Sequence, residues 1–363
     1  MAERFERGRG RLGVWAPLPP TVWLRPPLRQ RAFPLGEPGH RLLAFARQGL
    51  WLGVRTLGLG PGDEVLVPAY HHGSEVEALR RAGLRCRFYE SDALLEPLEE
   101  SLEQLLGPHT RALHLIHFFG FPQDGARWRR FCDNRGLLLI EDAAQAWLST
   151  RDDRPVGSLG DLAIFCMYKM VGLPDEGSAM LLPEPATRAA LDRRPGAPLL
   201  ARKHAQWLAS RLPPAGRMLE PRRQRRPYDA EGDCDLGDPE AMPWSTTRFL
   251  LDRLGEESVA ARRRRNYRVL LEALGDRVAS GFRSVPAGAS PFLLPVETDD
   301  KHALIERLDR LGIEAWDVWS TPHSSLPRGE FPDAEARRAR TVGLPVHQEL
   351  RLRDLERIAA AVP

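Results

Sequence analysis

Two carboxylates and a glutamine follow a short run of apolar residues, and a lone lysine comes about one strand later. Leu137–Ile140 is entirely apolar and leads into Glu141, Asp142 and, three residues further on, Gln145. This pattern predicts a buried strand with polar residues at its C-terminal end, which is where ligands bind in an open α/β sheet. Lys169 stands among aromatic, sulfur-containing and aliphatic neighbours.

The acid and the amine together suit one kind of cofactor chemistry. A lysine in apolar surroundings loses solvation of its charged form, which makes the amine a better nucleophile. A carboxylate that holds a pyridinium nitrogen and an amine that forms a Schiff base are the two groups that pyridoxal phosphate requires of a protein. Taken singly, Asp142 also suits a helix N-cap, and Lys169 an edge-strand lysine whose amine reaches water. Their order and surroundings favour the cofactor.

Composition bounds the class of protein. A length of 363 residues with 42% hydrophobic content fits one large domain and a smaller one. The 52 basic and 49 acidic residues nearly balance, which gives little support to a nucleic-acid-binding role. The four cysteines are far apart and form no CxxC pair, as is typical of reduced thiols in a cytoplasmic protein. We expect no signal peptide and no membrane span, because no apolar run approaches ~20 residues.

Hydrophobic periodicity divides the chain into an arm and two domains. Residues 1–40 are rich in proline and arginine and predict an irregular arm; residues 41–245 form a large cofactor-binding domain. In the large domain we expect strands over Val65–Ala69, Cys86–Tyr89, Ala112–Phe118, Leu137–Ile140, Leu162–Met167 and Ala179–Leu182, and helices over Arg41–Leu59, Glu75–Ala82, Leu98–Leu106 and Ala126–Asn134. This alternation predicts an α/β fold whose mainly parallel sheet is covered by helices on both faces.

The remainder, residues 246–363, predicts a long helix and a small C-terminal α+β domain. The helix extends over Thr246–Leu274. The small domain is expected to contain strands over Phe292–Val296 and near Glu314–Val318, and helices over Lys301–Leu311 and Leu352–Val362. The basic cluster Arg222–Arg226 suits a solvated loop better than a phosphate site, and no third ligand accompanies His71-His72, so we expect no metal.

Several segments carry a resemblance to a known family. Glu141–Ala146 reads Glu-Asp-Ala-Ala-Gln-Ala, Leu57–Pro68 contains a Gly-Pro-Gly-Asp turn before a strand, and Leu344–His347 reads Leu-Pro-Val-His. With Thr110–Pro122, these segments resemble the DegT/StrS family of pyridoxal-phosphate-dependent sugar aminotransferases, of the aspartate-aminotransferase fold type. The resemblance covers most of the chain from about residue 42. It implies the PLP-dependent transferase fold, pyridoxal 5'-phosphate as the cofactor and a homodimer whose sites are completed by the neighbouring subunit.

The resemblance also implies roles for the central residues. Asp142 would pair with the pyridinium nitrogen, and Gln145 would hydrogen-bond the cofactor's phenolic oxygen. Lys169 would form the Schiff base and then move the proton between substrate and cofactor. This choice of lysine follows from the spacing to Gly177; an ungapped match from the upstream side would place Val171 there instead.

Other positions depart from the family's pattern. Arg47 and Gln48 stand in place of its Gly-Thr phosphate loop, at the start of a helix, where backbone N–H groups favour an anion. His72 replaces the aromatic residue that stacks on the cofactor ring, and Cys166 replaces a phosphate-binding serine. Glu176 replaces the first of two glycines.

Two further groups have a less definite role. Arg262–Asn266 would touch the partner subunit or substrate phosphates. Trp316 and Trp319 suit either the lining of a substrate pocket or core packing.

The leading functional hypothesis is transfer of an amino group, with glutamate as donor, to a keto-sugar linked to a nucleotide. Such a reaction belongs to polysaccharide or secondary-metabolite sugar biosynthesis. A pyridoxal-phosphate-dependent sugar dehydratase stays open as an alternative, although family members of that type replace the lysine with histidine. A catalytically silent binding protein that keeps the fold is the third hypothesis, favoured by the unusual phosphate loop and Glu176.

Overall fold

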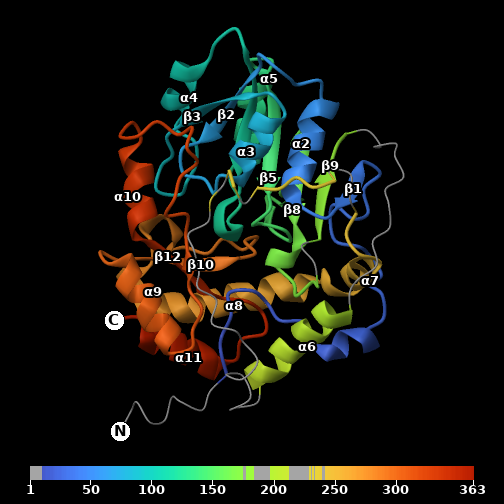
Figure 1. Cartoon of the computed structure of the whole chain (residues 1–363), viewed down its shortest axis with the longest axis vertical. Helices are drawn as coiled ribbons and strands as arrows, with labels where there is room; N and C mark the ends of the chain where they lie inside the picture. The colour runs from blue at the N-terminus through green and yellow to red at the C-terminus, as the bar shows by residue number, and fades with distance from the viewer. Residues whose placement is uncertain are drawn as a thin grey trace.

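Seven strands form the central sheet in the upper half of Figure 1, in the order β1-β9-β8-β5-β4-β2-β3. The computed structural model describes residues 10–174, 177–183, 197–211, 229, 231–232, 234–238 and 242–363. The strands are β1 (His40–Leu43), β2 (Glu64–Pro68), β3 (Arg85–Tyr89), β4 (Thr110–Ile116), β5 (Leu138–Ala143), β8 (Leu162–Cys166) and β9 (Ser178–Leu181). Neighbouring strands from β3 to β8 pair in parallel, whereas β9 runs antiparallel to both β8 and β1. The expected mainly parallel sheet is confirmed.

Helices pack on both faces of this sheet because successive strand residues point to opposite sides. On β2, Val65 and Val67 belong to the larger core, while Leu66 between them belongs to a second one. The second core also contains Leu102 of α4 (Glu99–Leu105) and Trp128 of α5 (Gly125–Asp133). On the opposite face lie α2 (Ala46–Thr56) and α3 (Ser74–Arg81). A methyl group on Gly53 of α2 would come within 2.4 Å of Leu162, so α2 can approach β8 closely only with glycine there.

The expected helix over Arg41–Leu59 is wrong at its beginning. His40–Leu43 forms edge strand β1, and α2 begins only at Ala46. Backbone pairing with β9, from His40 opposite Leu181 to Leu43 opposite Ser178, fixes this segment as a strand. Four residues are too few for their apolar spacing to distinguish helix from strand.

A second sheet of three strands lies below the first in Figure 1, in the order β10-β12-β11. Its strands are β10 (Leu293–Glu297), β11 (Trp316–Asp317) and β12 (Thr341–Pro345), with α9 (Lys301–Arg310) between the first two. The closing helix α11 (Leu352–Ala361) was expected, but central strand β12 and α10 (Pro332–Arg340) were not. Because β12 contains Gly343 and ends in Pro345, its composition gives a weak strand signal. A methyl group on Gly343 would come within 2.6 Å of Leu293 on the adjacent strand.

The expected single helix over Thr246–Leu274 is two helices. Helix α7 (Ser245–Leu254) ends at Gly255, and α8 (Glu257–Leu274) begins two residues later. Gly255 lies against the ring of Trp147, where an added methyl group would approach it to 3.2 Å. Trp23 of the arm stacks on Phe249 of α7 and contacts His204 of helix α6 (Ala197–Arg211).

The N-terminal arm is anchored to the remainder of the molecule. Residues Pro20–Leu24 form a short 3-10 helix, and Val14, Leu18 and Val22 are buried in the main core. Leu12 pairs with Ile313 of the C-terminal part. None of the described helices combines the length and the hydropathy that crossing a bilayer requires.

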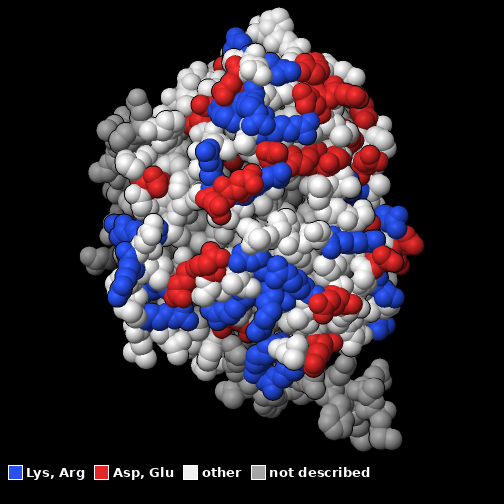
Figure 2. All heavy atoms as spheres, turned by 180° about the vertical axis from the view of Figure 1, so that it is seen from behind, with Lys and Arg blue, Asp and Glu red and all other residues white. Residues whose placement is uncertain are grey.

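Charged side chains are distributed unevenly over the face turned away from the view of Figure 1. Acidic and basic residues are mixed in its upper half, and lysines and arginines gather in its lower half (Figure 2). The near-zero net charge therefore does not describe each region of the surface. The prediction that nucleic acid is not a ligand stays a prediction.

Candidate active site

Asp142 lies near the C-terminal end of β5, as the sequence predicted, and a histidine from the neighbouring strand stands behind it. Its Oδ1 accepts a hydrogen bond from the backbone N–H of Ala144 at 2.9 Å, and its Oδ2 lies 3.4 Å from His114 Nε2 on β4. Burial acts to raise the pKa of Asp142, but the contact with His114 and the nearby Lys169 outweigh it and lower the pKa. Asp142 is therefore an anion at neutral pH, the form that pairs with a protonated ring nitrogen.

Glu141 points away from this group and braces the loops around it. Its Oε1 accepts from His117 Nε2 at 3.1 Å and from the backbone N–H of Gly157 at 3.2 Å. The backbone of Gln123 donates to His117 Nδ1, so the ring proton lies on Nε2. Leu159 donates to Glu141 Oε2 at 2.8 Å. These contacts outweigh burial and lower the pKa of Glu141, which acts as a structural anion.

Gln145 is held by one end of its amide. Its Oε1 accepts from the backbone N–H of Phe119 at 3.0 Å, which leaves the Nε2 end as the donor for a ligand. The loop that carries Phe119 is fixed by Gly120, whose φ is +89° and whose added methyl would lie 2.0 Å from the carbonyl oxygen of Ser290. Phe292 donates to the Phe119 carbonyl oxygen at 2.7 Å. The loop beside Asp142 is thereby joined to the strand that leads into the small sheet.

Lys169 ends a single 3-10 turn, Met167–Lys169, that directly follows β8. Its Nζ lies 5.9 Å from the centre of the Phe292 ring. The rings of Trp15 and Trp316 pack against the Phe292 ring, with centroids 5.2 and 5.1 Å away. Trp15 also packs against Tyr168 at 5.1 Å. The lysine thus has the apolar, aromatic surroundings that its neighbours in the sequence suggested.

His72 lies in the loop that follows β2, two residues before α3 begins at Ser74. Burial, followed by the positive charges of Lys169, Arg47 and Arg338, lowers the pKa of His72 to about 3. Its ring is therefore neutral at pH 7; Nδ1 lies 3.0 Å from the Ser74 hydroxyl. The same charge interactions place Lys169 within electrostatic reach of both His72 and Asp142. Residues 97 positions apart in the sequence are brought into one site.

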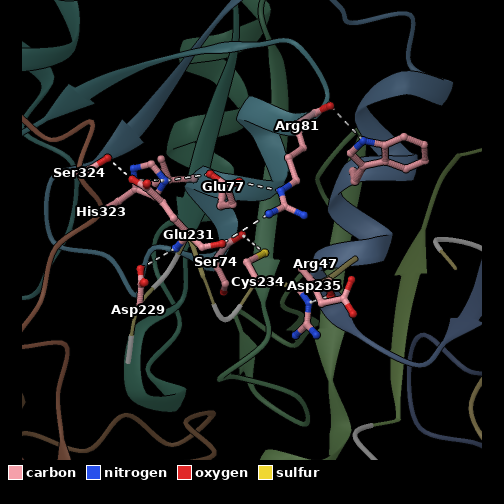
Figure 3. A network of polar contacts seen from close by, with 12 residues as sticks. Arg47, Ser74, Glu77, Arg81, Asp229, Glu231, Cys234, Asp235, His323 and Ser324 are labelled. Atoms are coloured by element: carbon pink, nitrogen blue, oxygen red, sulfur yellow. Dashed lines mark hydrogen bonds and ion pairs between the residues drawn. The ribbon is translucent and has the colours of Figure 1, made fainter. Parts of the chain in front are cut away.

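Arg47 and Gln48 do lie in the first turn of α2, but their side chains hold a protein segment (Figure 3 shows Arg47). Arg47 Nε donates to the carbonyl oxygen of Asp235 at 2.7 Å. Gln48 Nε2 donates to the carbonyl oxygens of Leu236 and Asp238, both at 2.7 Å, and its Oε1 accepts from Phe45. The side-chain amide of Gln48 makes these contacts within the protein, and its role as a phosphate ligand stays a prediction. Arg47 remains the candidate cation.

The same segment is held along its length by α3 and the C-terminal part (Figure 3). Arg81 of α3 forms an ion pair with Glu77 through Nε at 2.6 Å, and its Nη2 donates to the carbonyl oxygen of Glu231. His323 Nε2 lies 3.1 Å from Glu77, and Ser324 donates to the Glu231 carboxylate. Residues 229–238, so far as they are described, are thereby fixed beside the start of α2.

Two other residues expected at the site, Cys166 and Trp319, are buried and make contacts within the protein. Cys166 is buried, and its Sγ accepts from the Ser178 hydroxyl at 3.7 Å, so its role as a phosphate ligand stays a prediction. Trp319 is only 5% exposed and packs at 4.9 Å from Tyr70, while its ring lies 6.3 Å from His72. Glu176 and the cluster Arg222–Arg226 lie outside the described residues.

The expectation that Arg262–Asn266 meets a partner or substrate phosphates is wrong for two of its members. Arg263 and Asn266 are both fully buried. Arg263 donates to backbone carbonyl oxygens that include those of Lys169 and Met170, and Asn266 donates to that of His347 at 2.9 Å. Sequence reasoning missed these roles, as it missed that of His114. A run of arginines in an amphipathic helix predicts a face exposed to solvent, because the sequence does not show which backbone carbonyl oxygens pack against the helix.

The donor set fits pyridoxal phosphate. The carboxylate of Asp142 is anionic, the amine of Lys169 is within electrostatic reach of it, and the amide nitrogen of Gln145 is left as a donor. Arg47 lies at a helix N-terminus, where an anion is favoured. The ring of the cofactor would therefore be held by Asp142 and Gln145, and its phosphate would lie near Arg47.

The sequence of the large domain matches a known family. Residues 44–185 match the model of the DegT/DnrJ/EryC1/StrS aminotransferase family. These residues are therefore similar to that family. A dTDP-3-amino-3,4,6-trideoxy-alpha-D-glucose transaminase of Streptomyces venezuelae is 28% identical over 336 residues, which cover 86% of this chain and 79% of that protein. A dTDP-4-dehydro-2,3,6-trideoxy-D-glucose 4-aminotransferase of Saccharopolyspora spinosa is 34% identical, over 33% of this chain and 32% of its own length.

Two solved structures have the same fold as this chain. The aminotransferase TlmJ from Streptoalloteichus hindustanus superposes with a TM-score of 0.64 at 25% identity, covering 90% of this chain and 85% of its own. DesV of S. venezuelae, solved with a ketimine intermediate, gives a TM-score of 0.65 at 22% identity, with 89% of this chain and 83% of DesV covered. The expected resemblance to this family and the expected fold class are confirmed.

Proposed function

We propose that the protein is a pyridoxal-phosphate-dependent aminotransferase that acts on a keto-sugar linked to a nucleotide, with glutamate as the amino donor. The observation that carries the proposal is the meeting of Asp142, Lys169 and His72 from three different strand ends, within electrostatic reach of one another. The segment that supplies all three is similar to an aminotransferase family. Relatives named as acting on dTDP-, UDP- and GDP-linked sugars support the substrate class.

Each residue has a task that its surroundings support. Bound pyridoxal phosphate supplies an electron-withdrawing ring that stabilises the carbanion left when an amine loses its α-proton. Asp142, kept anionic by His114, would hold the ring nitrogen in its protonated form. Lys169 Nζ would hold the cofactor covalently, and as a free amine it would accept and return a proton. His72, neutral at pH 7, would contact the cofactor without adding a second positive charge.

The test uses the small number of lysines in the chain. Its three lysines are Lys169, Lys203 and Lys301, so the site of a reduced cofactor adduct is easily assigned. Protein mixed with pyridoxal phosphate is reduced with borohydride, and the modified peptide is identified by mass spectrometry, with Lys169→Ala and Lys203→Ala alongside. We expect the adduct on Lys169, its loss in Lys169→Ala only, and loss of the visible absorbance band when glutamate is added before reduction.

Three other results would separate the alternatives. No adduct in the wild type would refute the proposal and leave a silent binding protein. An adduct that glutamate does not discharge, together with release of water from a nucleotide-linked sugar, would indicate a dehydratase. An adduct on Lys203 or Lys301 would show that the wrong lysine has been assigned.

A further inference from the structure

A fully buried arginine holds the turn that carries Lys169. Arg263 of α8 is 0% exposed, and each of its five N–H donors has a hydrogen-bond acceptor. Nη2 donates to the carbonyl oxygens of Lys169 at 3.3 Å and Met170 at 2.8 Å; Nη1 donates to those of Pro291 at 2.9 Å and Phe292 at 3.3 Å. Nε donates to Gln348 Oε1 at 3.0 Å. One guanidinium group therefore gathers three separate segments of the chain.

Two of the four residues whose carbonyl oxygens Arg263 binds also meet through their side chains. Lys169 Nζ lies 5.9 Å from the centre of the Phe292 ring. Arg263 bonds to the carbonyl oxygens of both residues, so it fixes the distance between the lysine's backbone and the ring against which its side chain lies. Gln348, itself bound to Arg263, also donates to the Met170 carbonyl oxygen at 3.1 Å.

A contribution to folding stability does not by itself explain why an arginine is buried at position 263. Among the residues that the structure describes, no carboxylate forms an ion pair with Arg263, and burial lowers the pKa of Arg263 to about 9. It stays protonated at neutral pH, so the protein carries an uncompensated cation in its interior, which costs free energy. Apolar residues of similar volume often stabilise a fold as well as buried ions do. What only a guanidinium offers is a planar fork of five donors with fixed directions.

We propose that Arg263 is a positioning residue that sets the location of the Lys169 amine by bonding to the carbonyl oxygens of Lys169 and Phe292. The consequence for turnover rests on the proposed function, whereas the geometric role does not. Lysine at position 263 keeps the charge but cannot reach all five acceptors, and methionine keeps the volume without charge or donors.

Asn266 provides a matched control on the same helix. It is fully buried, like Arg263, and its Nδ2 donates to the carbonyl oxygens of Val346 and His347 at 3.4 and 2.9 Å. Removing it takes a donor away from buried carbonyl groups, as removing Arg263 does, but those groups belong to the C-terminal part and not to the lysine turn. A general weakening of the fold would affect both variants alike.

The first measurement does not require the cofactor. Protein without pyridoxal phosphate is treated with formaldehyde and cyanoborohydride across a pH series, and methylation of Lys169 relative to Lys203 is followed by peptide mass spectrometry. We expect Arg263→Lys and Arg263→Met to raise this ratio several-fold, because the amine is no longer held in one place, and Asn266→Ala to leave it at the wild-type value. Thermal midpoints are measured on all four proteins, and Arg263→Lys provides the result should Arg263→Met fail to fold.

A second measurement links position to catalysis. In the presence of pyridoxal phosphate, kcat for amino transfer should fall roughly 10- to 100-fold in Arg263→Lys with little change in KM, as expected for displacement of a reacting group by about 1 Å. Equal Lys169 labelling in wild type and Arg263→Lys, or an equal change in Asn266→Ala, would overturn the positioning role. If the wild type fails to react with the cofactor, the proposed function fails, while the labelling ratio still decides the role of Arg263.

Discussion

The neutral state of His72 predicts a specific pH dependence of folding stability. Burial, followed by the charges of Lys169, Arg47 and Arg338, lowers the pKa of His72 to about 3 from its ordinary 6.5. Between these values the unfolded chain binds a proton that the folded protein does not bind. This contribution to stability is therefore complete above about pH 6.5 and is lost as the pH falls.

The size of the effect follows from the same two values. Each pH unit in this window changes the free energy of unfolding by about 1.4 kcal/mol for one proton. Lowering the pH from 6.5 to 5 should therefore cost the wild type about 2 kcal/mol through His72. His72→Phe keeps a ring at this position and removes the titrating group, so its stability should fall by that much less over the same interval. Any constant gain from the added apolar surface does not enter the comparison.

The assay is urea unfolding followed by tryptophan fluorescence and circular dichroism at several pH values between 5 and 7. His71 is also buried with its pKa lowered, and it contributes equally to wild type and variant, so the difference between their slopes isolates His72. His302→Gln serves as the control, because the side chain of His302 is 82% exposed. Stability curves of wild type and His72→Phe that remain parallel across this range would refute the reasoning.

Three further changes test the groups around the site. Arg338→Met leaves the carbonyl oxygens of Ala69, His71 and Trp319 without this donor, and should lower the free energy of unfolding by about 1–3 kcal/mol in urea titrations; an unchanged free energy of unfolding would contradict the bracing role. Asp142→Asn should lower kcat roughly 10²-fold or more while pyridoxal phosphate still binds, as measured by fluorescence titration; near-normal turnover would count against its pairing with the ring nitrogen. His114→Leu leaves burial to raise the pKa of Asp142, so the acidic limb of the pH–rate profile should move to higher pH, and an unchanged limb would remove His114 from the site.

Local patterns in the sequence were sufficient for most of the large domain. Leu137–Ile140 followed by Glu141 and Asp142 predicted strand β5 with its acid at the C-terminal end, because an apolar run of this length reports burial on both faces. The chemistry proposed for Asp142 and Lys169 also rests on residue types and order. Element ends were less well predicted: the segment before α2 is strand β1, and the long C-terminal helix is divided at Gly255.

Contacts between distant residues decided what the sequence could not. The roles of Arg263 and Arg338 depend on carbonyl oxygens that are 19 to 269 residues away along the chain, and the spacing of residues in the sequence does not identify such acceptors. His114 acts on Asp142 only because β4 and β5 pair in a register that places them on adjacent strands. Gln48 likewise acquires its bracing role from the segment that reaches the start of α2. Residue types and order determined which chemical groups the protein has; long-range backbone pairing and burial determined which of them meet, which stay charged and which only hold the others in place.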